Sequence, residues 1–123
     1  MTPIVNQYGE TVAFLHLNII INQQQDTVLG LILGNCVFGE TDAPVGKFFK
    51  DCFRKINGKI IAELGEETSP VRPSDEPFIL KQAWEKLTAV KNHLCVWVDE
   101  KDEWSEENFL SFLQVQKSNA VAV

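Results

Sequence analysis

The chain has 123 residues, of which 45% are hydrophobic and 23% are charged, and its formal net charge is −6. This length suits one folded domain, and the composition excludes a disordered, collagen-like or coiled-coil protein. The acidic balance counts against a general nucleic-acid binder, which needs a basic surface, and against binding to an anionic membrane. We therefore expect a single globular domain over residues 1–123 that binds neither nucleic acid nor membranes.

The first third of the chain predicts a long β-hairpin. Residues 11–22 alternate between a uniformly apolar set and a mixed set, which is the pattern of a strand with one buried face. A polar break at residues 23–26 separates this strand from residues 27–38, which are rich in β-branched and aliphatic side chains. We expect two long antiparallel strands here, and we find no internal repeat of solenoid length.

Residues 42–57 carry apolar side chains at helical spacing. Asn57-Gly58 is also a strong hairpin signal, but one continuous strand would place Asp51 and Phe53 on the same face. We therefore predict a helix that ends at the glycine. The apolar positions of this helix are Phe48, Phe49, Cys52, Phe53 and Ile56.

The remaining non-helical segments can be placed from composition. Residues 59–64 predict a short strand, and residues 65–74 predict a loop because prolines, glutamates and a glycine interrupt any apolar period. Residues 94–98 are apolar on both faces, which is typical of a central strand, and we expect Trp97 to be buried there. Residues 117–123 show no period, and we expect them to fray.

Two further helices are predicted in the second half of the chain. One begins at Ser74 or Asp75 and presents an apolar stripe on one face. The other is capped by Ser105, with Trp104 and Phe109 at the two positions of a hydrophobic staple.

These elements together predict an α+β (mixed α/β) fold. An N-terminal long β-hairpin leads into β-α-β-α units, giving a single mixed sheet of about five strands with three helices. That element order resembles the topology of ribonuclease H-like domains. However, the polar residues on the first long strand are His16 and Asn18, not the acidic residue that such nucleases need.

The cysteines predict neither a metal site nor a disulfide. Cys36, Cys52 and Cys95 are odd in number and far apart, and there is no C-x-x-C pair. We expect three free, buried thiols in a reducing compartment, and therefore a cytoplasmic protein without a bound cofactor.

No catalytic motif is evident, so we predict no catalytic residues. His16 and His93 are interpreted as structural or surface residues, with a base or ligand role for His16 as the alternative. The best enzymatic alternative is a small metal-assisted hydrolase, in which carboxylates at strand ends hold a hard divalent cation. These carboxylates are Asp99 and Glu100 after one strand, and Glu66 and Glu67 after another.

An acidic run at residues 99–107, with a balance of −5, is the most distinctive feature, and residues 47–59 carry a balance of +4. An aromatic side chain within a charged rim is a common arrangement in protein interfaces. We therefore predict a non-enzymatic protein-binding domain, such as an inhibitor, an immunity-type or an adaptor protein, that engages a basic partner through this acidic end. A second alternative is self-association as a homodimer, in which the basic helix meets the acidic end of a neighbour. The predicted partner-binding residues are Asp99, Glu100, Asp102, Glu103 and Trp104.

Overall fold

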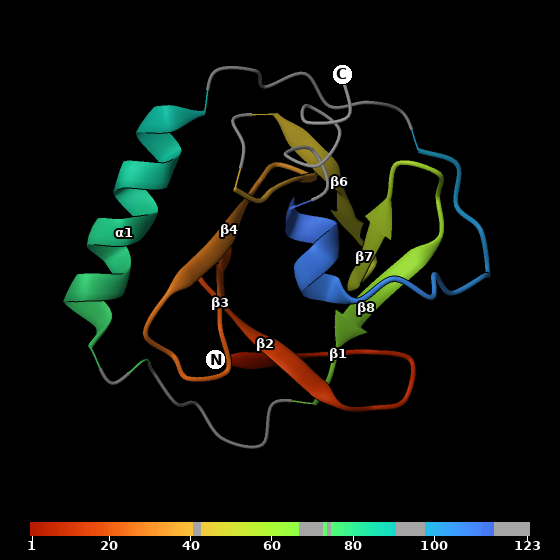
Figure 1. Ribbon diagram of the computed structural model, residues 1–123, viewed down its shortest axis with the longest axis horizontal. Coiled ribbons are helices and arrows are strands. Elements are labelled where there is room, and N and C mark those ends of the chain that lie inside the picture. Colours follow the sequence, from red (N-terminus) through yellow and green to blue (C-terminus); the bar gives the residue numbers. More distant parts are fainter. Residues whose placement is uncertain (41–42, 67–72, 74, 91–97, 115–123) are drawn as a thin grey trace.

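The computed structural model describes residues 1–40, 43–66, 73, 75–90 and 98–114. Its strands form a closed antiparallel barrel in which neighbours along the chain are also neighbours in the sheet (Figure 1). The first and last strands pair with each other, so the barrel presents no free strand edge. The strands are β1 (Thr2–Val5), β2 (Thr11–His16), β3 (Ile19–Ile21), β4 (Val28–Leu33), β5 (Cys36–Phe38), β6 (Pro44–Phe49), β7 (Cys52–Lys55) and β8 (Ile60–Leu64).

The predicted α+β fold is wrong, because this barrel replaces the mixed sheet with three helices. Residues 42–57, predicted to be a helix, instead contain β6 and β7. A turn at Lys50 and Asp51, with φ values of 53° and 62°, joins the two strands and places Phe48 opposite Phe53. Apolar side chains alternate along each strand, and the turn between the strands shifts this alternation. The apolar residues of the two strands together therefore have a spacing that resembles that of a helix. The resemblance to ribonuclease H-like topology fails with the same correction.

The predicted long hairpin is divided into four shorter strands. Leu17 and Asn18, with φ values of 52° and 65°, form a turn between β2 and β3. Gly34, with a φ of 60°, lies in the turn between β4 and β5. The polar break is a turn as predicted, since the backbone N–H of Asn22 donates to the carbonyl of Thr27 at 3.0 Å.

The barrel contains one hairpin unit four times. In each unit a buried apolar residue of the first strand faces a glycine or alanine of the second strand, and the register shifts directly after it. The shift is a β-bulge, which increases the local twist that closure of a small barrel requires. Successive units are 16 or 17 residues apart, which is shorter than a solenoid repeat. The four pairs are Ile4 with Ala13, Ile20 with Gly30, Val37 with Gly46, and Phe53 with Ala62.

A single apolar cluster forms the core of the barrel. Every strand contributes at least one buried residue to it, and the C-terminal helical segment adds three more. Burial of this apolar surface is the main favourable term in folding. The cluster consists of Ile4, Ala13, Ile20, Ile32, Val37, Val45, Phe53, Ile61, Ala62, Phe109, Phe112 and Leu113.

The helix predicted to begin at Ser74 or Asp75 is confirmed as α1 (Glu76–Ala89). Asp75 caps it, since its side chain accepts a hydrogen bond from the backbone N–H of Phe78 at 3.3 Å. The helix lies against the outside of β3 and β4 (Figure 1). Its buried residues Ile79 and Ala83 pack on Ile19, Ile21, Val28 and Leu31.

The last described helical segment covers residues 109–114 and begins later than predicted. Asn108 caps it by accepting from the backbone N–H of Ser111 at 2.7 Å. Ser105, the predicted cap, is buried in the preceding turn, where its hydroxyl accepts from the N–H of Glu107 at 3.2 Å. The predicted staple around Ser105 is therefore wrong.

Residues 104–114 lie across the end of the barrel where its longer turns gather (Figure 1). Leu113 accepts a hydrogen bond at 3.2 Å from the N–H of Glu40, in the turn after β5. At the other end of the segment, Trp104 pairs with Ile60 of β8. This end of the barrel holds the candidate site.

Several predictions fall outside the described residues. They concern residues 117–123, most of the 65–74 loop, and residues 91–97 with Trp97. Val98, at the end of the predicted central strand, is buried but is not part of a strand. Among the described residues, no helix has both the length and the hydropathy needed to cross a bilayer.

Candidate functional site

The acidic run lies against the basic segment of the same chain. Residues 98–103 lie alongside the turn between β7 and β8. Three lysines of the basic segment form ion pairs with acidic side chains of the run. The predicted self-association through these charges therefore loses its basis, because the basic segment is a hairpin that already faces the acidic run. The ion pairs are Lys50–Glu100 at 3.1 Å, Lys59–Glu103 at 3.7 Å and Lys55–Glu107 at 2.6 Å.

Backbone hydrogen bonds fix the acidic run in register with β8. The N–H of Ile60 donates to the carbonyl of Glu103 at 2.9 Å, and the N–H of Ser105 donates to the carbonyl of Ile60 at 2.8 Å. Gly58 is required at the start of this contact, because its φ is 91° and a Cβ there would overlap the carbonyl oxygen of Asp99. The run is thus an ordered extension of the barrel.

Arg54 is the side chain that joins the run to the hairpin. Only 6% of its surface is exposed, and its Nη1 donates to the carbonyls of Gly58 at 2.9 Å and Lys101 at 2.7 Å. Its guanidinium also lies over the ring of Phe49, 5.5 Å from the centroid. The buried Arg54 charge, held by two carbonyls and one ring, therefore has a structural role: it fastens the acidic run to the hairpin. We call this arrangement the clasp.

We expect Arg54→Met to lower the free energy of unfolding by about 2 kcal/mol, because two hydrogen bonds from a charged donor are lost and the Gly58 carbonyl keeps only its bond from the backbone N–H of Lys101, at 3.3 Å. Methionine keeps most of the apolar length of the side chain. Hydrogen exchange of the Ser105 amide should accelerate as the run loosens. Lys50→Met, at an exposed position, serves as the control and should change stability by less than about 0.5 kcal/mol. Equal effects of the two substitutions would contradict the clasp.

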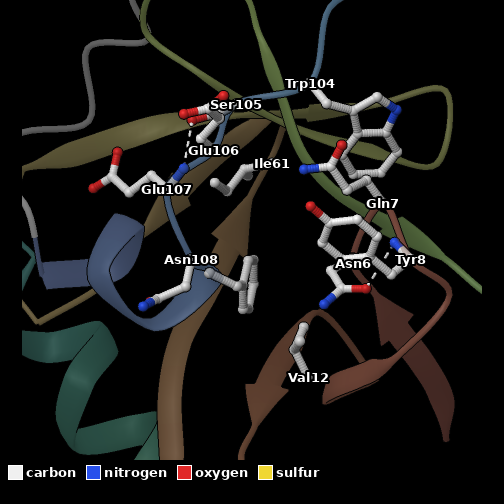
Figure 2. Close-up of a pocket in the computed structure, with 11 residues that line it drawn as sticks. Asn6, Gln7, Tyr8, Val12, Ile61, Trp104, Ser105, Glu106, Glu107 and Asn108 are labelled. Atoms are coloured by element: carbon white, nitrogen blue, oxygen red, sulfur yellow. Dashed lines mark hydrogen bonds between the residues drawn. The ribbon is translucent and has the colours of Figure 1, made fainter.

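An open pocket of about 480 Å³ lies beside the ordered run. Figure 2 shows the rings of Trp104 and Tyr8 on one side with Gln7 between them, and residues 105–107 on the other side. The apolar side chains that line the pocket are Val12, Ile61 and Phe109. Its two sides come from opposite ends of the chain.

The turn before β2 holds Tyr8 toward solvent. The Asn6 side-chain oxygen accepts from the backbone N–H groups of Tyr8 and Glu10, both at 3.0 Å, which fixes the turn. Tyr8 is 76% exposed even though it lies next to the pocket. A large aromatic ring held in water by an ordered turn contributes little to folding and is available to a ligand.

The carboxylates of the pocket differ in their partners. Glu107 is paired with Lys55, whereas Glu106 is exposed and has no ion pair within the described residues. The pocket therefore combines one uncompensated negative charge with three aromatic rings, those of Tyr8, Trp104 and Phe109. This combination favours a cationic group, which is attracted both to a carboxylate and to the face of an aromatic ring.

The structure places the five predicted partner-binding residues in different surroundings. Only Trp104 lines the pocket, while Glu100 and Glu103 face lysines. Asp99 and Asp102 are exposed residues of the run and do not line the pocket. The sequence reasoning missed Gln7, Tyr8 and Glu106; the exposed tyrosine beside Gly9 in a turn was the available signal for the first side of the pocket.

The part of the chain that the structure describes offers no donor set for the metal-assisted alternative. Among the described residues no three His, Cys, Asp or Glu side chains are grouped to hold a metal ion. Glu67, one of the four carboxylates predicted for this role, lies outside those residues. His16 forms an ion pair or hydrogen bond with Glu76 in the first turn of α1, at 2.7 Å between Nε2 and Oε2, which gives it a structural role.

The prediction of three free thiols is wrong. Cys36 is disulfide-bonded, whereas Cys52 is a free, half-buried thiol. Burial raises the pKa of the Cys52 thiol, and the nearby Arg54 charge offsets only part of this effect. Cys52 is therefore not activated as a nucleophile, and the argument for a reducing compartment loses its main support.

No protein-family model matches the chain, and neither a curated protein nor a solved structure matches it at a significant level. A functional proposal therefore rests on the pocket and its charges.

Proposed function

We propose that the protein is a non-enzymatic protein-binding domain, of the inhibitor, immunity-type or adaptor kind, that engages a basic partner at the acidic end of its barrel. A Lys or Arg side chain of the partner enters the pocket beside Trp104. The observation that carries this proposal is the meeting of Trp104, Tyr8 and Glu106 around one opening.

The size and composition of the pocket support this ligand class. A volume of about 480 Å³ lies within the range of about 300–1,000 Å³ for small-ligand sites, so one long side chain fits easily. Val12 and Ile61 offer apolar surface to the aliphatic stem, and the rings and Glu106 attract the charged end. A planar guanidinium can also stack on an indole ring, so arginine suits this pocket better than lysine.

The charge of the whole chain supports association with a basic partner. The net charge of −6 attracts a cationic surface at a distance. Because three acidic side chains of the run are paired with lysines, the affinity should depend on the pocket more than on the number of acids. Asp99 and Asp102, which are exposed outside the pocket, would add mainly to the rate of association.

Calorimetric titration with short peptides tests the proposal. We expect a glycine-serine peptide with one central arginine to bind, and the same peptide with neutral citrulline to bind at least tenfold more weakly. Glu106→Gln and Trp104→Leu should each weaken arginine-peptide binding about tenfold, equivalent to about 1.4 kcal/mol. Asp102→Asn, which removes an acid outside the pocket, is the matched control and should change affinity less than threefold.

Two results would contradict the proposal. Equal binding of the arginine and citrulline peptides would show that charge is not recognised. A loss of affinity in Asp102→Asn as large as in Glu106→Gln would show that the acidic surface acts as a whole and that the pocket has no special role.

A further inference from the structure

A second surface, on the side of the molecule opposite to the pocket, is apolar and exposed. It is a groove of about 420 Å³ between α1 and the β2–β3 turn, next to β4. In Figure 1, α1 lies at one edge of the molecule, and the segment that begins at residue 98 starts at the opposite edge. The apolar residues that line the groove include Leu17, Leu31, Leu33, Leu80, Trp84 and Leu87.

Two of these side chains are much more exposed than folding requires. Leu17 is 71% exposed and Trp84 is 65% exposed. Leu17 also has a φ of 52°, a left-handed conformation that costs leucine about 1–2 kcal/mol and suits glycine or asparagine better. The turn between β2 and β3 holds Leu17 in this conformation, and its side chain stays exposed, so it is available for apolar contact with a partner.

The charges on α1 indicate what covers this surface. Lys81 and Glu85 lie one turn apart on the exposed side of the helix, and neither forms an ion pair within the described residues. Lysine placed before glutamate at this spacing is also the weaker order for pairing within one helix. If a second α1 runs antiparallel to the first, Lys81 of each copy faces Glu85 of the other.

We infer that α1 and its groove form the interface of a two-fold symmetric homodimer. Trp84 and Leu17 of each copy supply apolar contact, and the reciprocal Lys81–Glu85 pairs set the antiparallel register. This interface uses neither the basic hairpin nor the acidic run, and it is independent of the proposed pocket function.

The expected affinity follows from the size of the surface. A 14-residue helix is about 21 Å long, so this face is smaller than the roughly 800 Å² per partner of a standard interface. The dimer is therefore weak, with a dissociation constant in the micromolar range or above. Measurements must extend to high protein concentration.

Analytical ultracentrifugation from 10 µM to 1 mM tests this inference. We expect the mean mass of the wild-type chain to rise toward that of a dimer across this range. Lys81→Glu and Glu85→Lys should each raise the dissociation constant at least tenfold, because like charges then face each other. An equimolar mixture of the two variants should dimerise as well as the wild type, since opposite charges meet again, and the double variant should do the same.

Recovery in the mixture cannot come from a helix stability effect, because each variant keeps its own altered helix. Circular dichroism should show that both variants are folded, and Lys101→Glu, on the far side of the molecule, serves as the charge-matched control. Glu106→Gln should leave dimerisation unchanged, which separates this test from that of the pocket. A wild-type chain that stays monomeric to 1 mM, or a mixture that stays as monomeric as its components, would overturn the inference.

Discussion

Replacement of Phe53 by alanine is expected to lower the free energy of unfolding by about 3–5 kcal/mol, the range for removing a large buried aromatic side chain. Phe53 is 0% exposed and lies in β7 at the centre of the barrel core. Its ring is 4.6 Å from that of Phe48 and meets the ring of Phe109 edge-on at 5.2 Å. It therefore ties the hairpin to the C-terminal segment that forms the site.

Urea denaturation at pH 7 measures this loss. Phe53→Leu, which keeps most of the apolar volume, is the control and should cost only about 1 kcal/mol. A loss below about 1 kcal/mol in the alanine variant would mean that the ring is not part of the core.

Gly46→Ala is expected to cost about 3 kcal/mol, although it adds only one methyl group. A Cβ at this position would overlap the carbonyl oxygen of Arg54 and lie 2.8 Å from Cζ of Phe112. The overlap is with backbone of the neighbouring strand, so relief requires the barrel wall to move. The corresponding positions of two other hairpin units hold Ala13 and Ala62, which shows how closely each unit is fitted to its own surroundings.

The matched control is Gly34→Asn. Gly34 has a φ of 60°, which asparagine tolerates, and no atom lies within 4 Å of the position that a Cβ would take there. We expect its stability to change by less than about 1 kcal/mol. If Gly46→Ala proves as mild as this control in thermal and urea unfolding, the close approach of β6 and β7 is incorrect.

Local signals predicted the parts of the fold that depend on local interactions. The apolar stripe and capping aspartate of α1, the short strand ending at Leu64, and the turn after Asn22 all follow from neighbouring residues. The barrel was missed because two of its tight turns lack the expected residues, and because the hairpin signal of Asn57-Gly58 was rejected in favour of a helix. The turns at Leu17-Asn18 and Lys50-Asp51 have left-handed backbone conformations, and most sequences place a glycine at such positions.

The candidate site was missed for a different reason. Its two sides, Tyr8 and Trp104, are far apart in the sequence. They come together because β1 pairs with β8 and Trp104 also pairs with β8, at Ile60. Composition identified the acidic run but not its lysine partners, since the basic segment was predicted to be a helix.

The most direct test of the pocket is the response of the Trp104 indole to a cation. The chain has three tryptophans, and the indole N–H signal that is missing in Trp104→Phe identifies the one at the pocket. In ¹⁵N-labelled protein, we expect this signal to shift in a saturable manner with the arginine peptide and to stay in place with the citrulline peptide. An unmoved Trp104 signal while the arginine peptide binds, or equal shifts with both peptides, would contradict the proposal that this pocket recognises a basic side chain.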